Sequence, residues 1–419
     1  MTNSVKTFLE KHHFFSYQEN RNYLDKLNKQ ISLKLALNNP LTIKFSENSE
    51  NLQSSKNLKT FLFMDLGGTH LRLYLCHTQN NQVTILKEEK SKFYKDIIYT
   101  PDSFLGELHN AINLFLQTHQ LAIPEQIILS FANKLQPTIQ QDKLEGQILY
   151  FGKKHQQQGL IGLNLASSLE HFLHQRHLKT KIKVINDGSL TALSGKFQSP
   201  TSTVISLIAG TGTNINIAYT HEQNLYLANL EFGDFNFFPY NIFDQELNKQ
   251  TPTDNHYLTE KLFAGAWQNQ LFIIILKSAF RERLIKQETT INKLRGLSSE
   301  DLEQLFGNKQ TIENASNADL EICQQIWSEL THRGAEICAL AIKELSSKLT
   351  ELGYLTNELL IVESGAIFEH STDFREKFES HLKQFFNAQT NTPKVSLNIS
   401  LYSNKSLCNG AATLLSLLP

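Results

Sequence analysis

The sequence contains few cysteines, and they are not arranged for metal binding or cross-linking. The four are far apart, at Cys76, Cys323, Cys338 and Cys408, and none belongs to a CxxC pair. Zinc knuckles and disulfide frameworks use closely spaced cysteines, so this spacing argues against both. Such cysteine usage fits a reducing compartment, and we expect the cytoplasm.

An excess of charge of one sign is also missing. Lys plus Arg number 40 against 41 for Asp plus Glu, which gives a formal net charge of -1. Proteins that bind nucleic acid or anionic membranes usually carry a basic excess. We therefore expect a small-molecule partner, with no nucleic acid and no membrane among the partners.

Long apolar runs are absent as well. No stretch approaches the ~18 uninterrupted apolar residues of a membrane-spanning helix, and the first thirty residues are dotted with Lys, Glu, Asp and Asn. We expect neither a membrane span nor a signal peptide. At 419 residues, the chain is long enough for two domains of ordinary size.

The most informative stretch is FLFMDLGGTHLRLYLC, residues 61–76. Its apolar run predicts a buried strand, Gly67-Gly68-Thr69 predicts a tight turn, and alternating leucines predict a second strand. Glycines let backbone N–H groups and the Thr69 hydroxyl approach a phosphate, and Asp65 is placed to hold hydrated magnesium. An ordinary hairpin with a Gly-Gly turn explains the stretch equally well.

A second stretch, VISLIAGTGTNINIAY at residues 204–219, repeats this pattern around Gly210-Thr211-Gly212-Thr213. Two such hairpins suggest an internally repeated α/β fold with phosphate held between its halves. No Lys follows the glycines, so this is not a Walker loop. A strand follows rather than a helix, so it is not a Rossmann fingerprint either.

Several acidic and basic side chains stand at the ends of predicted elements. Asp187 follows a short buried strand predicted over residues 181–185, and open α/β sheets bind ligands at such strand ends. Asp187 is thus a candidate general base, or alternatively an N-cap for the helix predicted over 189–195. Glu231, Glu260 and Lys153 each resemble ordinary surface residues when taken alone.

The hydrophobic pattern predicts the remaining elements. Helices are expected within residues 5–37, 103–119, 160–172, 320–352 and 407–418. Strands are expected over residues 83–88 and 127–131 and from residue 359, and a strand pair is expected to turn at Pro137.

The order of these motifs resembles that of the hexokinase family, the eukaryotic-type branch of the actin-like sugar kinases. MDLGGTHLR resembles the family's LDLGGTNFR, VINDGSLTAL its VNDTVGTL, IAGTGTNINIAY its IVGTGTNACY, and NLEFGDF its NMEWGAF. TEKLFAG resembles FEKMISG, ESGAIF resembles DGSVY, and NGAATLL resembles GRGAALV. The matches run in the family's order from about Phe61 to the C-terminus.

The resemblance implies an α/β fold of two actin-like (ribonuclease H-like) domains with a ligand cleft between them. The small domain would comprise residues 56–185 plus 407–419, and the large domain residues 1–55 plus 186–406. It also implies site roles. Asp187 would be the general base, and hexose hydroxyls would contact Lys153, Asn186, Asp187, Asn214, Asn229, Glu231 and Glu260. ATP with Mg²⁺ would be bound by Asp65, Gly67, Gly68, Thr69, Arg72, Gly210, Thr211, Gly212, Gly265, Gly365 and Gly410.

The sequence departs from the family's pattern on one wall of the expected sugar site. The family's LGFTFSFP becomes LSFANKLQP, so that Lys134 or Leu135 replaces a sugar-binding serine. Gly152 stands where the family has a threonine, and His70 where it has an asparagine. The departures therefore concern sugar preference, whereas the catalytic and phosphate residues of the pattern are kept.

The function implied is ATP-dependent phosphorylation of a hexose, glucose at its 6-hydroxyl first and mannose or fructose next, as the first step of glycolysis. One alternative is a catalytically weak hexokinase-like protein that senses sugar or nucleotide. Another is a sugar kinase of the bacterial repressor/kinase type, which would be expected to carry a cysteine-rich zinc motif that this sequence lacks.

Overall fold

The structure, a computed structural model, describes most of the chain. The described residues are 2–15, 22–37, 41–44, 59–68, 70–79, 82–93, 98–140, 143–150, 156–251, 256–307, 313, 315–355, 358–387 and 396–418. Thr69, Gly152 and Lys153, named above, lie outside the described residues.

Packing divides the chain into two compact units, and each is described by itself. The Asp187 unit comprises Pro40–Ser206, Asn216–Ala228 and Asn404–Pro419. The Glu260 unit comprises Met1–Asn39, Leu207–Ile215 and Asn229–Ser403. Packing units need not coincide with domains, so the domain boundaries drawn from the sequence stay a prediction.

A five-stranded sheet forms the centre of the Asp187 unit. Its order is β10-β6-β2-β3-β4, with parallel pairing among β10, β6 and β2 and antiparallel pairing among β2, β3 and β4. The strands are β2 (Lys59–Leu66), β3 (His70–Gln79), β4 (Gln82–Lys92), β6 (Gln126–Phe131) and β10 (Lys181–Asn186). The predicted strand–Gly/Gly–strand hairpin is confirmed as β2 and β3.

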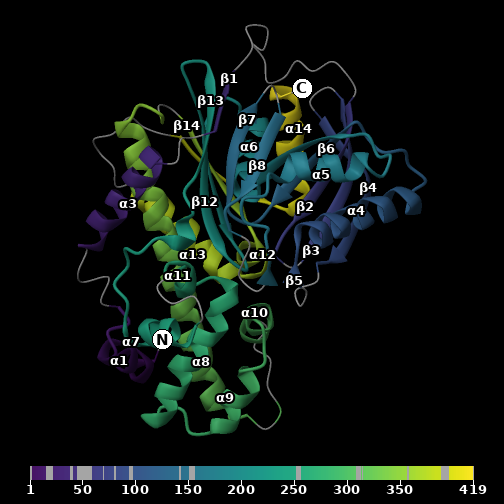
Figure 1. Cartoon of the computed structure of the whole chain (residues 1–419). Coiled ribbons are helices and arrows are strands. Elements are labelled where there is room, and N and C mark those ends of the chain that lie inside the picture. The colour runs from purple at the N-terminus through teal and green to yellow at the C-terminus, as the bar shows by residue number, and fades with distance from the viewer. Residues whose placement is uncertain are drawn as a thin grey trace. The chain divides into compact units, whose positions relative to one another are not determined.

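Two helices pack on this sheet (Figure 1). α4 (Pro101–Thr118) begins at a capping box made by Thr100 and Ser103, and α5 (Leu165–His174) follows the N-cap Asn164. The predicted inner face of α4 is buried in one cluster with strand residues: Phe104, Leu105, Leu108, Ile112 and Phe115. Burial contributes roughly 1.5–3 kcal/mol for each large apolar side chain, which makes this cluster the core of the unit.

The Asp187 unit contains further short strands and helices. They are β1 (Leu41–Lys44), β5 (Ile98–Tyr99), β7 (Leu135–Gln140), β8 (Lys143–Ile148), β9 (Gln156–Gln157), α6 (Asp187–Gln198), η3 (Asn404–Ser406) and α14 (Leu407–Leu417).

The turn predicted at Pro137 is wrong. Pro137 lies inside β7, opposite Gly146 of β8, in a sheet of only these two strands. Proline has no N–H to donate, and a strand tolerates it where that donor is not needed for a central ladder. The strand therefore continues to Gln140.

The helix predicted from Leu160 begins five residues later, at Leu165. Gly162 has a φ of +88°, which is not a right-handed helical conformation, and Asn164 is extended at the N-cap. A chain with these two conformations cannot start a helix before residue 165. The apolar periodicity upstream of that point belongs to a turn.

A six-stranded sheet has the order β1-β13-β12-β11-β14-β15. Its further strands are β11 (Thr203–Ala209), β12 (Thr213–His221), β13 (Asn224–Asn229), β14 (Glu358–Ser364) and β15 (Ser396–Tyr402). The division between the two packing units runs through β11 and β12. The turn Gly210-Thr211-Gly212 joins these strands, as the sequence predicts.

Helices make up most of the Glu260 unit. They are α1 (Asn3–Lys11), α3 (Tyr23–Leu37), η1 (Phe232–Asp234), α7 (Ile242–Gln250), η2 (Glu260–Leu262), α8 (Gly265–Arg281), α9 (Glu288–Leu294), α10 (Ser299–Gly307), α11 (Asn317–Glu351), α12 (Ala366–His370) and α13 (Thr372–Asn387). The long α11 runs beside α13 (Figure 1). Across the described residues, no helix combines the length and apolar character needed to span a bilayer.

Candidate active site

Asp187 stands where a strand passes directly into a helix. It is the first residue of α6, immediately after β10, and its Oδ1 accepts a hydrogen bond from the Gly188 N–H at 2.8 Å. The preceding Asn186 is the N-cap, since its side chain also accepts from Gly188 N–H, at 3.0 Å. Asn186, and not Asp187, is therefore the N-cap residue of α6. The helix starts two residues before its predicted position.

Asn186 is itself held from its other side. Its Nδ2 donates to the carbonyl oxygens of Phe131 and Asn133 at 3.4 and 3.5 Å. These carbonyls belong to the end of β6 and the segment after it. The asparagine thus fixes the start of α6 to the neighbouring strand, which restrains the backbone that carries Asp187.

Asp65 and Arg72 face each other across the first hairpin. They are register partners in β2 and β3, and Arg72 Nη1 donates to Asp65 Oδ2 at 2.8 Å. Asp65 is only 4% exposed; burial raises the pKa of its carboxyl, and the Arg72 guanidinium opposes that rise. The residue predicted to hold magnesium and one predicted to hold phosphate are therefore paired with each other here.

The turn of this hairpin is tight but open on its outer side. Gly67 N–H donates to the His70 carbonyl at 3.0 Å, which closes the turn. A Cβ added at Gly68 would meet nothing within 4 Å. The side of Gly68 on which a Cβ would lie is therefore free of contact with the described residues beyond its chain neighbours.

The second Gly-Thr turn is fixed to the start of α8. Gly265 N–H donates to the Gly210 carbonyl at 2.8 Å, and Ala266 N–H donates to the Thr211 carbonyl at 3.1 Å. The Thr211 residue is exposed, so its hydroxyl is available to a ligand. Backbone bonds thus hold the turn rigid while a side chain of the predicted phosphate site is left accessible.

Gly365 packs against the same turn. Its φ is +102°, and a Cβ there would lie 2.5 Å from the Ala209 carbonyl oxygen and 3.2 Å from Gly210 N. Only glycine fits a position with this φ and this separation. The structure therefore brings together Gly210, Gly265 and Gly365, three glycines that the resemblance assigns to nucleotide binding.

Gly410 lies at a contact between two helices. A Cβ there would lie 2.3 Å from the Leu190 carbonyl oxygen, and Gly410 N–H donates to Ser194 Oγ at 3.0 Å. The glycine lets α14 approach the backbone of α6. Close helix packing thus accounts for this glycine in the structure.

Three of the predicted sugar-binding side chains form one hydrogen-bonded chain in the Glu260 unit. Asn214 Nδ2 donates to Asn229 Oδ1 at 2.9 Å, and Asn229 Nδ2 donates to Glu231 Oε1 at 2.8 Å. Glu231 has a left-handed backbone, with φ 51° and ψ 51°. Left-handed conformations are uncommon for a non-glycine residue and cluster at functional sites.

Glu260 is buried and held through both of its carboxylate oxygens. Oε2 accepts from Thr213 N–H at 3.1 Å, and Oε1 accepts from Trp267 Nε1–H at 3.3 Å. Trp267 is a positioning residue that the sequence analysis did not single out. The signal available in the sequence was its position seven residues after Glu260, just beyond Gly265 at the start of α8.

The arrangement is suited to a polyol and a phosphate in chemical terms. Carboxylates and amides accept from and donate to hydroxyl groups, while glycine turns and threonine hydroxyls donate to phosphate. Magnesium is usually held by one or two carboxylates together with substrate phosphates, and Asp65 beside the open Gly68 backbone fits that use. No group of three or more His, Cys, Asp or Glu side chains suited to a metal occurs in the described part of the chain.

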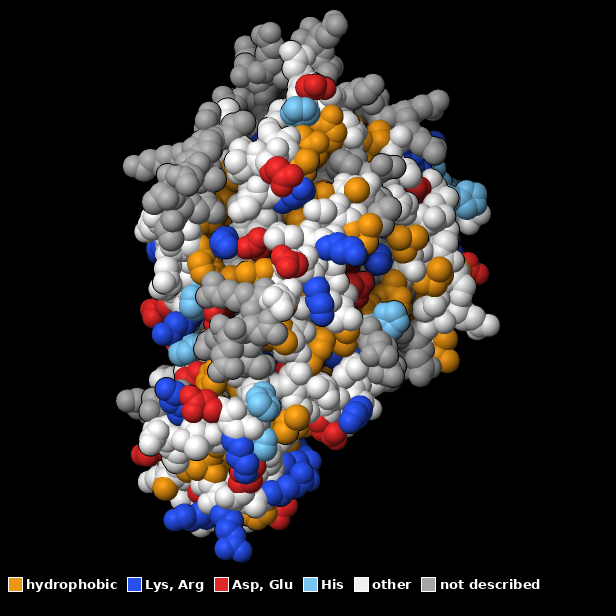
Figure 2. Space-filling model, turned by 90° about the vertical axis from the view of Figure 1, so that its left-hand side faces the viewer, with side chains coloured by type: hydrophobic (Ala, Val, Ile, Leu, Met, Phe, Trp, Pro, Cys, Tyr) orange, Lys and Arg blue, Asp and Glu red, His pale blue; other side chains and the backbone are white. Residues whose placement is uncertain are grey.

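One face of the molecule is shown in Figure 2. Acidic and basic side chains are interspersed on it, with lysines and arginines gathered at its lower end, where α8 and α9 lie in Figure 1. The mixture agrees with the near-equal totals of 40 and 41 in the sequence.

Two family models described as hexokinase match the chain, one over residues 5–197 and the other over residues 204–417. The chain belongs to the hexokinase family. ATP-dependent phosphoryl transfer to a sugar is the chemistry of that family.

Curated relatives are similar to this hexokinase family member over most of its length. Hexokinase-1 of Arabidopsis thaliana is 24% identical over 382 residues, which cover 80% of this chain and 75% of that protein. Hexokinase-5 of Oryza sativa subsp. japonica is 22% identical over 381 residues, covering 80% and 74%.

A solved structure confirms the fold. The hexokinase from Schistosoma mansoni complexed with glucose superposes with a TM-score of 0.74 and 15% identity, covering 98% of this chain and 99% of that one. The glucokinase from Balamuthia mandrillaris in complex with glucose gives a TM-score of 0.56 and 17% identity, covering 86% and 94%. The fold is that of hexokinase, with two actin-like domains.

Proposed function

We propose that this protein is a hexokinase that transfers the γ-phosphoryl group of ATP to the 6-hydroxyl of glucose. The observation that carries the proposal is the hydrogen-bonded chain of Asn214, Asn229 and Glu231, which joins the start of β12 to the end of β13 and the residue two positions beyond it. A set of fixed, alternating donors and acceptors matches the hydroxyls of a sugar ring. Mannose and fructose are further candidate substrates.

In this proposal Asp187 is the general base. The sugar hydroxyl oxygen forms a bond to the γ-phosphorus, the bond from that phosphorus to the bridging oxygen breaks, and ADP leaves with the electron pair. The hydroxyl proton passes to the Asp187 carboxylate. Phosphoryl transfer needs little covalent chemistry from the protein, so positioning and charge neutralisation account for the rest.

The hydroxyls of the sugar ring would be hydrogen-bonded by Asn186, Asp187, Asn214, Asn229, Glu231 and Glu260. Lys153, which lies outside the described residues, would also take part. Glu260 supports this role because its backbone-bonded carboxylate is already oriented before a ligand binds. Preorganised acceptors avoid the entropy cost of ordering long side chains.

The phosphates would be held by the two Gly-Thr turns. Gly67, Gly68, Thr69 and Arg72 belong to one turn, and Gly210, Thr211 and Gly212 to the other. Gly265 and Gly365 pack on the second turn, and Gly410 completes the proposed adenosine side. Mg²⁺, when bound, would neutralise phosphate charge near Asp65, and Arg72 would then be released from its present pairing toward phosphate.

We also propose a role in the first step of glycolysis and a location in the cytoplasm. The location is supported by the four buried cysteines, all of which are unpaired. Structural disulfides are rare in that compartment.

A catalytically weak sugar or nucleotide sensor is a second candidate. The pairing of Arg72 with Asp65 favours it, since the group proposed for phosphate and the group proposed for magnesium are occupied by each other. The substitutions at Lys134 or Leu135 and at Gly152 point the same way.

The deciding experiment is an assay of ADP release from ATP and Mg²⁺ against glucose, mannose, fructose and a no-sugar control. The proposal predicts sugar-dependent ADP release with glucose 6-phosphate as the product. Tight glucose binding by calorimetry without ADP release would favour the sensor instead.

A further inference from the structure

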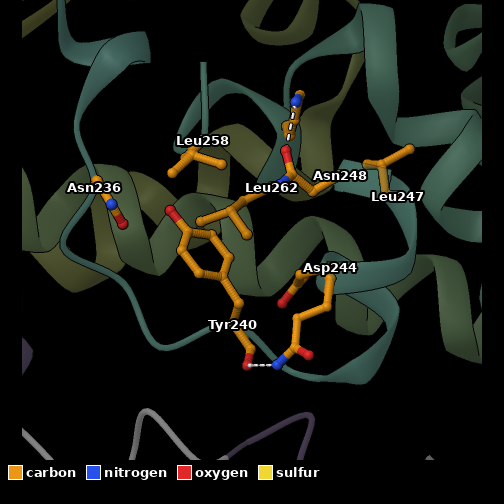
Figure 3. A pocket seen from close by; sticks show the side chains of 9 residues that line it. Asn236, Tyr240, Asp244, Leu247, Asn248, Leu258 and Leu262 are labelled. Atoms are coloured by element: carbon orange, nitrogen blue, oxygen red, sulfur yellow. Dashed lines mark hydrogen bonds between the residues drawn. The ribbon is translucent and has the colours of Figure 1, made fainter. Parts of the chain in front are cut away.

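A pocket of about 240 Å³ lies in the Glu260 unit, and Figure 3 shows the side chains that line it. Its carboxylate is already engaged, because Asp244 Oδ1 accepts from Arg333 Nη2 at 2.8 Å and Asp244 Oδ2 from Arg333 Nη1 at 3.0 Å. Lys261 Nζ donates to Asn248 Oδ1 at 2.7 Å, and the hydroxyl of Tyr240 is inaccessible. These polar groups are engaged or closed off, and we assign no ligand to the pocket.

The residue after Asp187 has a neighbouring side chain in the place where its own would be. A Cβ added at Gly188 would overlap Asn216 Nδ2 and would lie 2.6 Å from Asn216 Cγ. Gly188 has a helical backbone in the first turn of α6, and its φ is not positive. The glycine is therefore required by the space that Asn216 occupies, and not by an unusual backbone conformation.

Asn216 is fully buried on β12, and only one end of its amide is bonded. Its Oδ1 accepts from the hydroxyl of Ser189, in the first turn of α6, at 3.2 Å. Its Nδ2 has no hydrogen-bond partner in the described part of the chain. A buried amide donor left unsatisfied costs stability, so a structural core gains little from an asparagine here. The side chain is explained better by what it supports.

The backbone that Asn216 contacts is the one that orients Asp187. Gly188 N–H donates directly to Asp187 Oδ1 at 2.8 Å, and the Gly188 carbonyl accepts from Ser206 Oγ on β11 at 3.0 Å. The peptide groups on both sides of Gly188 are thus fixed by hydrogen bonds. A displacement of Gly188 would reach the Asp187 carboxylate through one peptide bond and one hydrogen bond.

This contact differs from the family's pattern at both of its residues. The motif VNDTVGTL has a threonine after its Asn-Asp pair, where this chain has Gly188. The motif IVGTGTNACY has a cysteine two residues after its asparagine, where this chain has Asn216. One position has lost a branched side chain while the position that it faces has gained an amide. Changes that compensate in volume at one contact are those that packing tolerates best.

We propose that Asn216 is a positioning residue for Asp187: its amide fills the place of a side chain at position 188 and holds the first turn of α6. Gly188 and Asn216 then form a matched pair, in which neither residue can change alone. This inference rests on the proposed function, in which Asp187 is the base. A misplacement of a reacting group by about 1 Å can lower a rate by about 10²-fold, so the pair should control kcat.

The test is a cycle of three variants: Gly188→Thr, Asn216→Cys and the double variant that carries both. Gly188→Thr places its side chain on the amide, and Asn216→Cys opens a gap beside Gly188 and removes the acceptor of Ser189. Each single variant should lower kcat for glucose-dependent ADP release by about tenfold or more. The double variant should recover to within about threefold of the wild type, and KM for ATP should stay within about twofold throughout.

Gly106→Ala is the matched control. Gly106 lies in α4 of the same unit, and a Cβ there would meet only the Phe172 ring, at 3.8 Å, which is an ordinary contact. This variant should leave kcat unchanged. If Gly188→Thr does not fold, Gly188→Ala adds only the Cβ, and it should show the same loss alone and the same recovery with Asn216→Cys.

Thermal unfolding of the same variants separates positioning from packing. Recovery of kcat in the double variant supports the proposal. Single variants with the wild-type kcat, or a double variant whose loss equals the product of the single losses, overturn it. Recovery of the Tm without recovery of kcat also overturns it, because the pair then only packs. A wild type that releases no ADP with any hexose refutes the proposed function instead, and the Tm values still show whether the two residues are matched.

Discussion

At the scale of single residues, Glu363 is a carboxyl group with an unusual environment. It lies on β14, two residues before Gly365, and its side chain is fully buried. Burial raises its pKa to about 7 from an ordinary value of 4.5, and nearby Glu379 adds to the rise. Arg375, whose Nε donates to Glu363 Oε2 at 3.1 Å, opposes it.

This shift predicts a pH-dependent stability. Because the folded-state pKa lies above the unfolded one, the favourable contribution is full below pH 4.5 and is lost as pH rises through about 7. The difference between these two pKa values corresponds to roughly 3 kcal/mol of unfolding free energy. As pH rises from about 5 to about 8, the wild type should lose unfolding free energy, and Glu363→Gln should not show that loss. Urea unfolding across this pH range measures the effect.

The control for this prediction is Glu376→Gln, an exposed carboxyl on the adjacent helix α13. It should leave the pH dependence of unfolding like that of the wild type. Parallel pH profiles for the wild type and Glu363→Gln would contradict a titrating Glu363.

Thr211 offers a residue-scale test of the phosphate turn. Thr211→Val keeps the shape and the backbone bond to Ala266 but removes the exposed hydroxyl. We expect KM for ATP to rise by about 2- to 12-fold, the value of one hydrogen bond, with KM for glucose unchanged. Steady-state kinetics with each substrate varied in turn measure both, and Thr201→Val, at another exposed threonine, is the control. Equal KM for ATP in the variant and the wild type would make the turn purely structural.

At the scale of elements, the junction of β11, α8 and β14 is held by backbone contacts. The turn after β11 bonds to the start of α8, and Gly365 at the end of β14 touches Ala209 and Gly210. These contacts explain why a glycine is needed at position 365, just after β14, although this position is distant in sequence from the Gly210 turn that it packs against.

Gly365→Ala should therefore damage both stability and nucleotide binding. The φ of +102° and the 2.5 Å approach to the Ala209 carbonyl oxygen leave no room for a methyl group. We expect a loss of about 1–3 kcal/mol in unfolding free energy, or more, and a raised KM for ATP. Gly296→Ala, where a Cβ meets nothing within 4 Å, should change neither. A Gly365→Ala protein as stable as the wild type would refute the close packing.

The elements were largely predictable because their cause is local. The apolar face of α4 and the glycine turns of both hairpins follow from periodicity and from the lack of a Cβ, which the sequence displays directly. The turn predicted at Pro137 and the helix start predicted at Leu160 were wrong because both depend on tertiary or backbone context. Pro137 is tolerated only because β7 pairs in a separate two-stranded sheet, and the helix after Leu160 is delayed by the conformation of Gly162.

The site was predictable in its members and less so in its contacts. Resemblance named Asn214, Asn229 and Glu231, but their chain of hydrogen bonds is a tertiary feature. Trp267 was not predicted as a site residue because a tryptophan within an apolar pattern is typical of the hydrophobic core. Only the fold shows that its indole N–H donates to Glu260. The pairing of Arg72 with Asp65 depends on the register of β2 and β3.

At the scale of the whole molecule, the departures from the family's pattern predict the substrate profile. The family pattern has hydroxyl-bearing residues at the positions of Lys134 or Leu135 and of Gly152, and a sugar hydrogen bond from each would be worth about 0.5–1.5 kcal/mol. We expect glucose to be accepted with a high KM and with weak discrimination against mannose. A panel of KM values on the wild type and on Gly152→Thr measures this. Sharp discrimination at low KM that the restored threonine leaves unchanged would contradict it.

The central claim is that Asp187 accepts the sugar proton in an ATP-dependent kinase. Its most direct test is the kcat for glucose-dependent ADP release in Asp187→Asn, compared with Asp102→Asn, an exposed acid in the first turn of α4. Both variants remove a carboxylate from the first turn of a helix, so the loss of its interaction with the helix dipole is common to both. Asp187→Asn should lower kcat by about 10²- to 10⁴-fold while Asp102→Asn leaves it unchanged. Folded Asp187→Asn retaining more than about a tenth of the wild-type kcat would contradict the assignment.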